Sequence, residues 1–138
     1  MPYSFENKVV LITGGSRGIG AAIARGFAAS GAAVIIASRK QAAIDETVAA
    51  IRAAGGKASG ISCHTGKIRE IESLFDTIRR DFGRLDVLVN NAATNPYFGP
   101  FLEAGASFFD KTFEVNVKGY FFVAQEASRL MVKQDGGA

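Results

Sequence analysis

The stretch VVLITGGSRGIG, Val9 to Gly20, joins an apolar segment to an alanine-rich one through closely spaced glycines. Its spacing is TGxxxGxG, with glycines at positions 14, 18 and 20, rather than the GxGxxG of the commonest dinucleotide fingerprint. A strand that feeds a tight glycine turn and then a helix presents free backbone N–H groups and the positive end of a helix dipole. The stretch therefore predicts a turn that binds a pyrophosphate.

Apolar patterns predict alternating strands and helices along the chain. The predicted strands are 8–13, 33–38, 57–63 and 86–90, and the predicted helices are 18–30, 41–54, 67–82 and 106–134. In the first helix, Ile19, Ile23 and Phe27 recur every four residues and predict its buried face. The alternation indicates βαβ units with right-handed crossovers, and hence an α/β fold.

The last two segments differ from the others in composition. Residues 93–105 contain two prolines and several aromatic residues, which predicts an apolar loop at the carboxyl end of a strand. In the helix that follows, Gly119 marks a candidate break. Its apolar residues in register are Phe109, Phe113, Val117, Phe121 and Ala124.

The composition is that of one globular α/β domain, with 138 residues, 48% hydrophobic and 21% charged. No segment approaches the ~20 apolar residues that cross a bilayer, and the start MPYSFENK lacks the features of a signal peptide. The single cysteine, Cys63, cannot form an internal disulfide, which fits a reducing compartment. The formal net charge is +3, but the lysines and arginines are scattered among acidic residues, which argues against nucleic-acid binding. We expect a cytoplasmic protein that binds neither membranes nor nucleic acids.

Two further motifs follow the glycine turn. They are Asn90-Asn91-Ala92-Ala93 and Glu114-Val115-Asn116-Val117-Lys118-Gly119. With these three segments in this order, the chain resembles the short-chain dehydrogenase/reductase family over essentially its whole length. The resemblance implies a Rossmann-type doubly wound parallel sheet in three αβα layers, with strand order 3-2-1-4 and one domain over residues 1–138.

The resemblance also implies a chain that is truncated after the helix following the fourth strand. The family's catalytic serine and its Tyr-x-x-x-Lys pair lie further along. The tyrosines here are Tyr3, Tyr97 and Tyr120, and the residues four positions later are Asn7, Phe101 and Ala124. Because no lysine stands four residues after any of these tyrosines, we expect this chain to be the cofactor-binding part of an oxidoreductase and to be inactive by itself.

The family's cofactor contacts transfer by position to four segments of this sequence. They are Gly14, Ser16, Arg17, Gly18, Ile19 and Gly20 in the turn, Ser38, Arg39 and Lys40 after the second strand, His64 after the third, and Asn90, Ala92 and Ala93 after the fourth. Thr13 is expected to brace the turn through its hydroxyl. The family's usual NNAG is NNAA here, which suggests an ordinary backbone conformation rather than a lost site.

The residues that leave the second predicted strand indicate which nicotinamide cofactor binds. NAD-selective sites carry an acid about 20 residues beyond the glycines, whereas an arginine accommodates the extra phosphate of NADP. Here the segment is Ser38-Arg39-Lys40, and the nearest acid, Asp45, lies inside the next helix. Arg17 adds a second guanidinium, whose planar donors suit a phosphate. The sequence predicts NADP(H); the alternative is a solvated charged loop.

Three single residues have more than one interpretation. His64 stands where the family commonly has an aspartate that meets the adenine ring, so it either lines that pocket, lies on the plain surface, or takes part in chemistry. Cys63 is expected to be a small buried side chain rather than a nucleophile. Asn116 is the one member of the family's catalytic set that is present in this sequence. In the family, this asparagine lies at a distortion of the long helix and holds a water. The alternative interpretation is that Asn116 makes a local backbone hydrogen bond. No metal site is predicted.

The loop at 94–101, with the residues around Ser38 and His64, is similar to the branch of carbonyl reductases and retinol dehydrogenases. Its aromatic residues suit a lipophilic carbonyl or alcohol substrate, or they pack the loop onto the sheet. The alternative function is a short non-catalytic nucleotide-binding protein that needs a partner. Ending at residue 138 would leave the fourth strand as an unpaired edge, which favours the oxidoreductase. The family's long helices often pair subunits, so a full-length form is expected to be a homo-oligomer.

Overall fold

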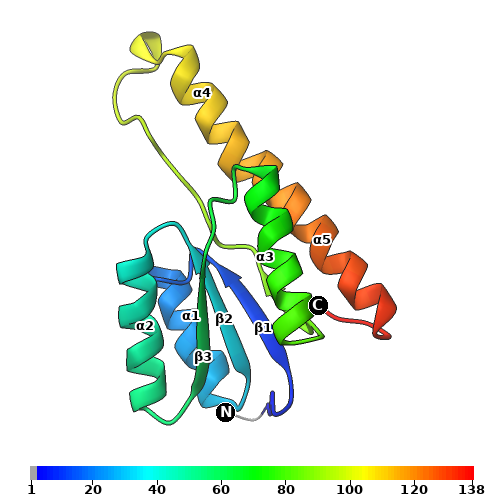
Figure 1. Ribbon diagram of the computed structural model, residues 1–138. Helices are drawn as coiled ribbons and strands as arrows, with labels where there is room; N and C mark the ends of the chain where they lie inside the picture. The colour runs from blue at the N-terminus through cyan, green and yellow to red at the C-terminus, as the bar shows by residue number, and fades with distance from the viewer. Residues whose placement is uncertain (1–2) are drawn as a thin grey trace.

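The computed structural model describes residues 3–138, which form one parallel sheet flanked by helices (Figure 1). The strands are β1 (Val9–Thr13), β2 (Ala33–Ser38), β3 (Lys57–Ser62) and β4 (Val87–Val89). Their spatial order is β3-β2-β1-β4, and every pairing is parallel. The Rossmann-type sheet and its strand order are therefore confirmed.

The helices cover both faces of this sheet. They are α1 (Gly18–Ala29), α2 (Gln41–Ala53), α3 (Ile68–Asp81), α4 (Ala106–Phe113) and α5 (Tyr120–Lys133), with a short 3-10 turn η1 (Phe101–Glu103) and a π-helix η2 (Glu114–Gly119). Because side chains alternate across a strand, β1 contributes Val10 and Ile12 to a core with α1 and α2, and Leu11 to a second core with α3 and α5. These two cores separate the three layers.

The predicted buried face of α1 is wrong. Its buried residues are Gly20, Ala21, Ala24 and Ala28, whereas Ile19 is 75% exposed. Small residues bring the helix close to the sheet, and a Cβ on Gly20 would overlap the carbonyl oxygen of Gly14. The larger side chains of Ile23 and Phe27 are only partly buried at the margin of the core.

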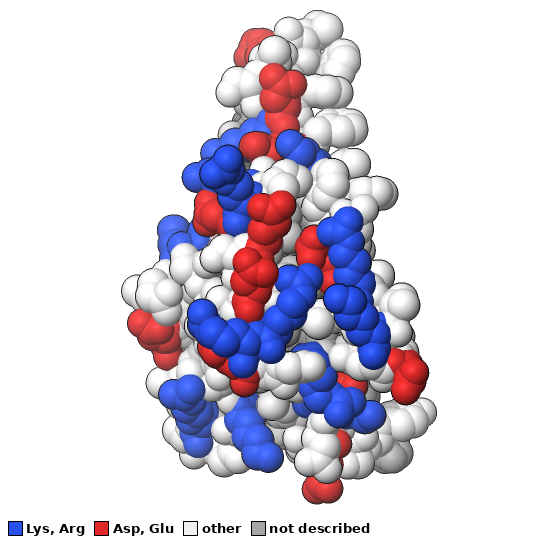
Figure 2. Space-filling model, turned by 45° about the vertical axis from the view of Figure 1, so that its right-hand side comes forward, with Lys and Arg blue, Asp and Glu red and all other residues white. Residues whose placement is uncertain are grey.

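The long helix predicted at 106–134 is interrupted by a π-helix rather than by a simple break at Gly119. In Figure 1, α4 and the loop before it project beyond the sheet. Phe109, Phe113, Val117 and Phe121, four of the residues expected in register, are 48–62% exposed and form an outward apolar stripe. Figure 2 shows charged side chains of both signs interspersed over the body, while the projecting end is mostly uncharged.

The outer edge of β4 is partly paired, which corrects the expectation of an unpaired edge. The Ala138 N–H donates to the Asp86 carbonyl at 2.8 Å, and the Leu88 N–H donates to the Ala138 carbonyl at 2.7 Å. Among residues 3–138, no helix is long and apolar enough to cross a membrane.

Candidate functional site

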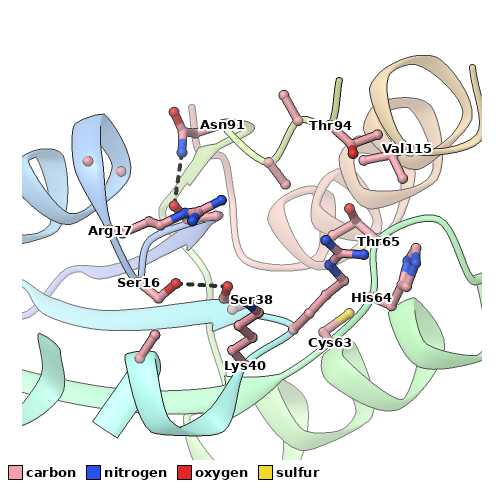
Figure 3. A pocket seen from close by; sticks show the side chains of 18 of the residues that line it. Ser16, Arg17, Ser38, Lys40, Cys63, His64, Thr65, Asn91, Thr94 and Val115 are labelled. Atoms are coloured by element: carbon pink, nitrogen blue, oxygen red, sulfur yellow. Dashed lines mark hydrogen bonds between the residues drawn. The ribbon is translucent and has the colours of Figure 1, made fainter. Parts of the chain in front are cut away.

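A cavity of about 520 Å³ lies where the chain leaves the carboxyl ends of the strands. Figure 3 shows it between the glycine turn, the end of β2 and the segment after β3. Twelve of the thirteen residues expected to bind the cofactor line it: Gly14, Ser16, Arg17, Gly18, Ile19, Gly20, Ser38, Arg39, Lys40, His64, Ala92 and Ala93. The topology thus gathers segments that are far apart in the sequence around one cavity.

The glycine turn has the geometry of a phosphate cradle. Gly14 and Gly18 adopt φ of +65° and +55°, which a side chain would strain. A Cβ on Gly18 would meet nothing within 4 Å, so the turn leaves open space above the start of α1. In the described part of the chain, no side chain caps that helix start, so its first N–H groups are free to meet an anion. The residues present therefore fit a pyrophosphate.

Thr13 braces the turn, as expected. Its buried hydroxyl accepts the N–H groups of Asn91 at 3.0 Å and Ala92 at 3.1 Å. A Cβ on Gly14 would lie 2.9 Å from the Ala92 Cα, so only glycine allows this close approach. The segment after β4 is thereby fixed against the turn after β1.

The cationic end of the cavity is built from two loops joined by a hydrogen bond. The Ser16 hydroxyl donates to the Ser38 hydroxyl at 2.9 Å, and Thr47 of α2 donates to the Ser16 carbonyl at 2.8 Å. Arg17 precedes α1, and Arg39 follows β2. With Lys40 they give the lining three cations, and none of its lining residues within 3–138 is acidic. This end suits an anionic ligand.

The opposite wall follows β3 and contains Cys63, His64 and Thr65. Burial, with a smaller effect of the Glu70 carboxylate, raises the pKa of the Cys63 thiol to about 12. The thiol therefore stays protonated, as expected for a buried small side chain rather than a nucleophile. The main-chain N–H of His64 donates to Glu70 Oε1 at 3.0 Å, and this hydrogen bond lowers the pKa of Glu70.

The two asparagines after β4 have different positions. Asn90 does not line the cavity, and its amide donates to the Tyr120 carbonyl at 3.0 Å. Asn91 does line it, and its amide donates to the carbonyls of Thr13 at 3.2 Å and Gly14 at 3.1 Å. Sequence reasoning named Asn90 as a cofactor contact, which stays a prediction, and did not name Asn91.

Asn116 lies in the π-helix, and its side chain bonds to the main chain of Thr94. Its side-chain oxygen accepts the Thr94 N–H at 2.8 Å, and its amide donates to the Thr94 carbonyl at 2.8 Å. Thr94 and the neighbouring Val115 line the cavity, whereas Asn116 does not. The side chain thus makes a backbone pairing, but with a residue 22 positions away rather than a local one. Thr65, Thr94 and Val115 also line the cavity, and none of them was predicted to do so.

The family model described as short chain dehydrogenase matches residues 8–138. Tropinone reductase-like 3 from Erythroxylum coca is 42% identical over 129 residues, which are 94% of this chain and 50% of that protein. A metagenomic short-chain oxidoreductase solved in complex with NADP has a TM-score of 0.92 and 32% identity, over 98% of this chain and 61% of the other. An NAD+-bound xylitol dehydrogenase has a TM-score of 0.93 and 31% identity, over 98% of this chain and 52% of the other. The chain spans about half the length of the curated relatives it matches.

Proposed function

The chain belongs to the short chain dehydrogenase family, and on that basis we propose that it provides the NADP(H) site of an oxidoreductase acting on an alcohol or ketone. The observation that carries this proposal is the cavity between the glycine turn and β2, with three cations and no acid among its described lining residues. The bound cofactor would supply the hydride. The protein's own residues hold its phosphates at the start of α1 and its base and ribose between the two walls.

The preference for NADP over NAD rests on the end of β2. The solved relatives include both an NADP complex and an NAD+ complex, so the fold accommodates either cofactor. An acid at this position would accept hydrogen bonds from the ribose hydroxyls, whereas an arginine pairs with an added phosphate. Arg39 and Lys40 directly follow β2, with Arg17 across the Ser16–Ser38 hydrogen bond. Three positive charges without an acid favour the dinucleotide with the extra phosphate.

The substrate we propose is an apolar carbonyl compound or the corresponding alcohol. The loop that leaves the cavity after Thr94 carries Phe98, Phe101 and Leu102, which are 99%, 89% and 92% exposed. Phe98 and Phe101 do not pack onto the sheet, which corrects that alternative. Tyr97 instead packs against Phe108 of α4, with ring centroids 5.3 Å apart. The loop thus presents apolar side chains that suit a lipophilic substrate.

Asn116 would help to position the reaction by fixing Thr94, and the proton-transferring residues would lie outside these 138 residues. We therefore expect the chain to bind NADP(H) without reducing a carbonyl by itself.

The full-length enzyme would be cytoplasmic and oligomeric, with the stripe of Phe109, Phe113, Val117 and Phe121 against another subunit. That same stripe favours the second candidate, a non-catalytic nucleotide-binding protein that needs a partner. The DNA beyond the codon for Ala138 distinguishes the two, because the oxidoreductase requires a following serine and Tyr-x-x-x-Lys.

Isothermal titration calorimetry of the chain with NADP+ and NAD+ tests the cofactor proposal. We expect NADP+ to bind at least tenfold more tightly, and Arg39→Asp to abolish or reverse this preference. Arg25→Asp on the exposed side of α1 makes the same charge change outside the cavity and serves as the control. Tighter binding of NAD+ by the unmodified chain would contradict the proposal.

A further inference from the structure

His64 is held in one orientation at the end of the cavity opposite Arg17 (Figure 3). The Gly66 N–H donates to His64 Nδ1 at 3.0 Å, which closes a tight turn after β3. A Cβ on Gly66 would lie 2.8 Å from the His64 Cε1 and 3.1 Å from the Glu114 side chain. The imidazole therefore packs directly against the backbone of the turn, and it has little freedom to rotate.

The hydrogen bond at Nδ1 fixes the chemical character of the other ring nitrogen. A nitrogen that accepts an N–H carries a lone pair, so in the neutral imidazole the proton lies on Nε2. Among residues 3–138, no side chain or carbonyl accepts a hydrogen bond from Nε2. His64 thus keeps one hydrogen-bond donor free on a residue that lines the cavity.

We propose that His64 determines the base specificity of this site by offering Nε2–H as a donor to the purine of the dinucleotide. The inference rests on the proposed function, because it assumes that the dinucleotide occupies the cavity. A donor pairs with a ring nitrogen of adenine or with the oxygen of a 6-oxopurine, but it does not pair with the 6-amino group. A carboxylate, the group expected here from the family resemblance, would accept from that amino group and oppose a 6-oxo group. The site therefore does not require a 6-amino purine.

The test compares NADP+ with its hypoxanthine analogue, nicotinamide hypoxanthine dinucleotide phosphate, by isothermal titration calorimetry. Two isosteric variants, His64→Asp and His64→Asn, form a matched pair. In both, the side-chain oxygen can accept the Gly66 N–H and keep the turn, because Asp and Asn close such turns in the same way. They differ in the remaining group, which is an acceptor in Asp and a donor in Asn.

The expected result is that the unmodified chain and His64→Asn bind the hypoxanthine analogue as tightly as NADP+ or more tightly. His64→Asp should bind the analogue about tenfold more weakly than NADP+, because a carboxylate then faces the 6-oxo group. Equal ratios in the two variants, or a strong preference of the unmodified chain for NADP+, would overturn the inference while leaving the cofactor site intact. If the unmodified chain binds neither dinucleotide, the proposed function itself fails.

Discussion

The part of the sheet formed by β1, β2 and β3 is held by main-chain ladders, whereas β4 and its neighbours are held largely by single side chains. Residues Val9–Thr13 pair with 33–37, and β2 pairs along its whole length with β3. Strand β4 has only three residues in register with β1. Around it, side chains bond to the main chain: Asp86 to Val9, Gln134 to Leu85, Asn90 to Tyr120 and Asn116 to Thr94. Main-chain pairing and the packing of its apolar core against α1 and α2 therefore specify the first region, whereas individual polar groups specify much of the second.

Overfilling the first region should have the largest effect. In Gly20→Ala, the new methyl group would overlap the Gly14 carbonyl, so the backbone of the turn would have to shift. We expect a loss of about 3 kcal/mol in the free energy of unfolding, together with loss of dinucleotide binding. Gly26→Ala in the same helix meets nothing within 4 Å and should instead stabilise by about 0.5–1 kcal/mol. Urea unfolding of both variants measures the contrast, and equal effects would contradict it.

Removing one carboxylate should weaken the second region by less. Asp86 is buried, and its Oδ2 accepts the Val9 N–H at 2.8 Å while Arg84 donates to both oxygens. Asp86→Ala leaves that N–H without its acceptor, so we expect a loss of about 1–3 kcal/mol in the free energy of unfolding. If β4 were held by its ladder alone, urea unfolding would show no such loss.

The same carboxylate should make stability depend on pH. Burial alone would raise the pKa of Asp86, but the hydrogen bonds from Arg84 and the Val9 N–H, together with the positive charges of Arg84 and Lys8, lower the pKa overall. The stabilisation is therefore complete above the unfolded-state pKa of about 4 and is lost as the pH falls through the lower folded-state value. Asp86→Asn should flatten this acid limb of the stability curve. An unchanged limb in that variant would assign the pH dependence to other carboxylates.

The two regions also differ in how far the sequence predicts them. Apolar periodicity predicts the strand and helix positions within a residue or two, and the turn motif predicts six of the residues that line the cavity, because these are local patterns. The other predicted lining residues come from the family resemblance. Apolar periodicity misplaces the buried face of α1, because the alanines of this helix allow a closer approach to the sheet than Ile19 would. The roles of Asn91, Thr94 and Asn116 depend on hydrogen bonds over 22 to 78 positions, for which a single sequence has no local signature.

Variants of two side-chain amides in the second region distinguish an effect on stability from an effect on NADP+ binding. Asn116 bonds to both main-chain groups of Thr94 beside the cavity, and Gln134 bonds to both main-chain groups of Leu85, which is not a lining residue. We expect Asn116→Ala and Gln134→Ala each to cost about 1–2 kcal/mol in the free energy of unfolding. Only Asn116→Ala should also weaken NADP+ binding, by a few fold in calorimetry. A similar loss of affinity in both variants would mean that the cavity wall responds to general loosening.

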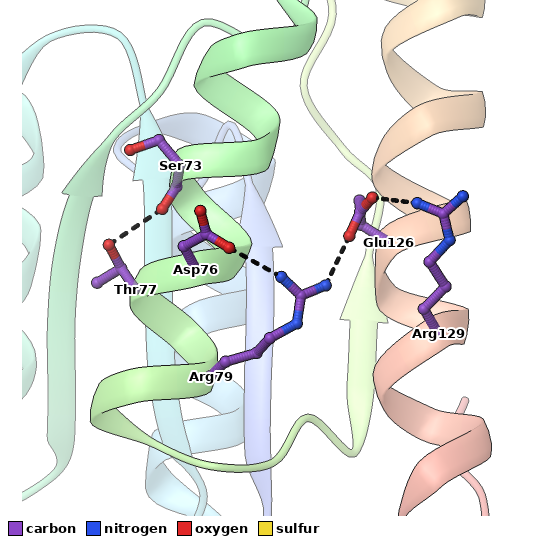
Figure 4. A network of polar contacts seen from close by, with 6 residues as sticks. All are labelled: Ser73, Asp76, Thr77, Arg79, Glu126 and Arg129. Carbon is purple, nitrogen blue, oxygen red and sulfur yellow. Dashed lines mark hydrogen bonds and ion pairs between the residues drawn. The ribbon is translucent and has the colours of Figure 1, made fainter.

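The smallest effect should come from the ion pairs that join α3 to α5 (Figure 4). Arg79 donates to Glu126 at 2.7 Å, and Glu126 also accepts from Arg129 within α5. Because the Arg79 side chain is 37% exposed, solvent screens much of this attraction. A double-mutant cycle with Arg79→Ala and Glu126→Ala should give a coupling of about 0.5–1 kcal/mol that shrinks in high salt.

Arg80 provides the matched control for that cycle, because within residues 3–138 its one ion pair is with the adjacent Asp81 on the same helix and joins no two elements. Arg80→Ala should leave the unfolding midpoint unchanged at any salt concentration. If instead it matched Arg79→Ala, the link between α3 and α5 would contribute nothing beyond local helix charge. The attachment of α5 would then rest on the apolar contacts of Val123, Ala127 and Leu130 in the core with α3, and this part of the second region would be specified by packing, as the first is.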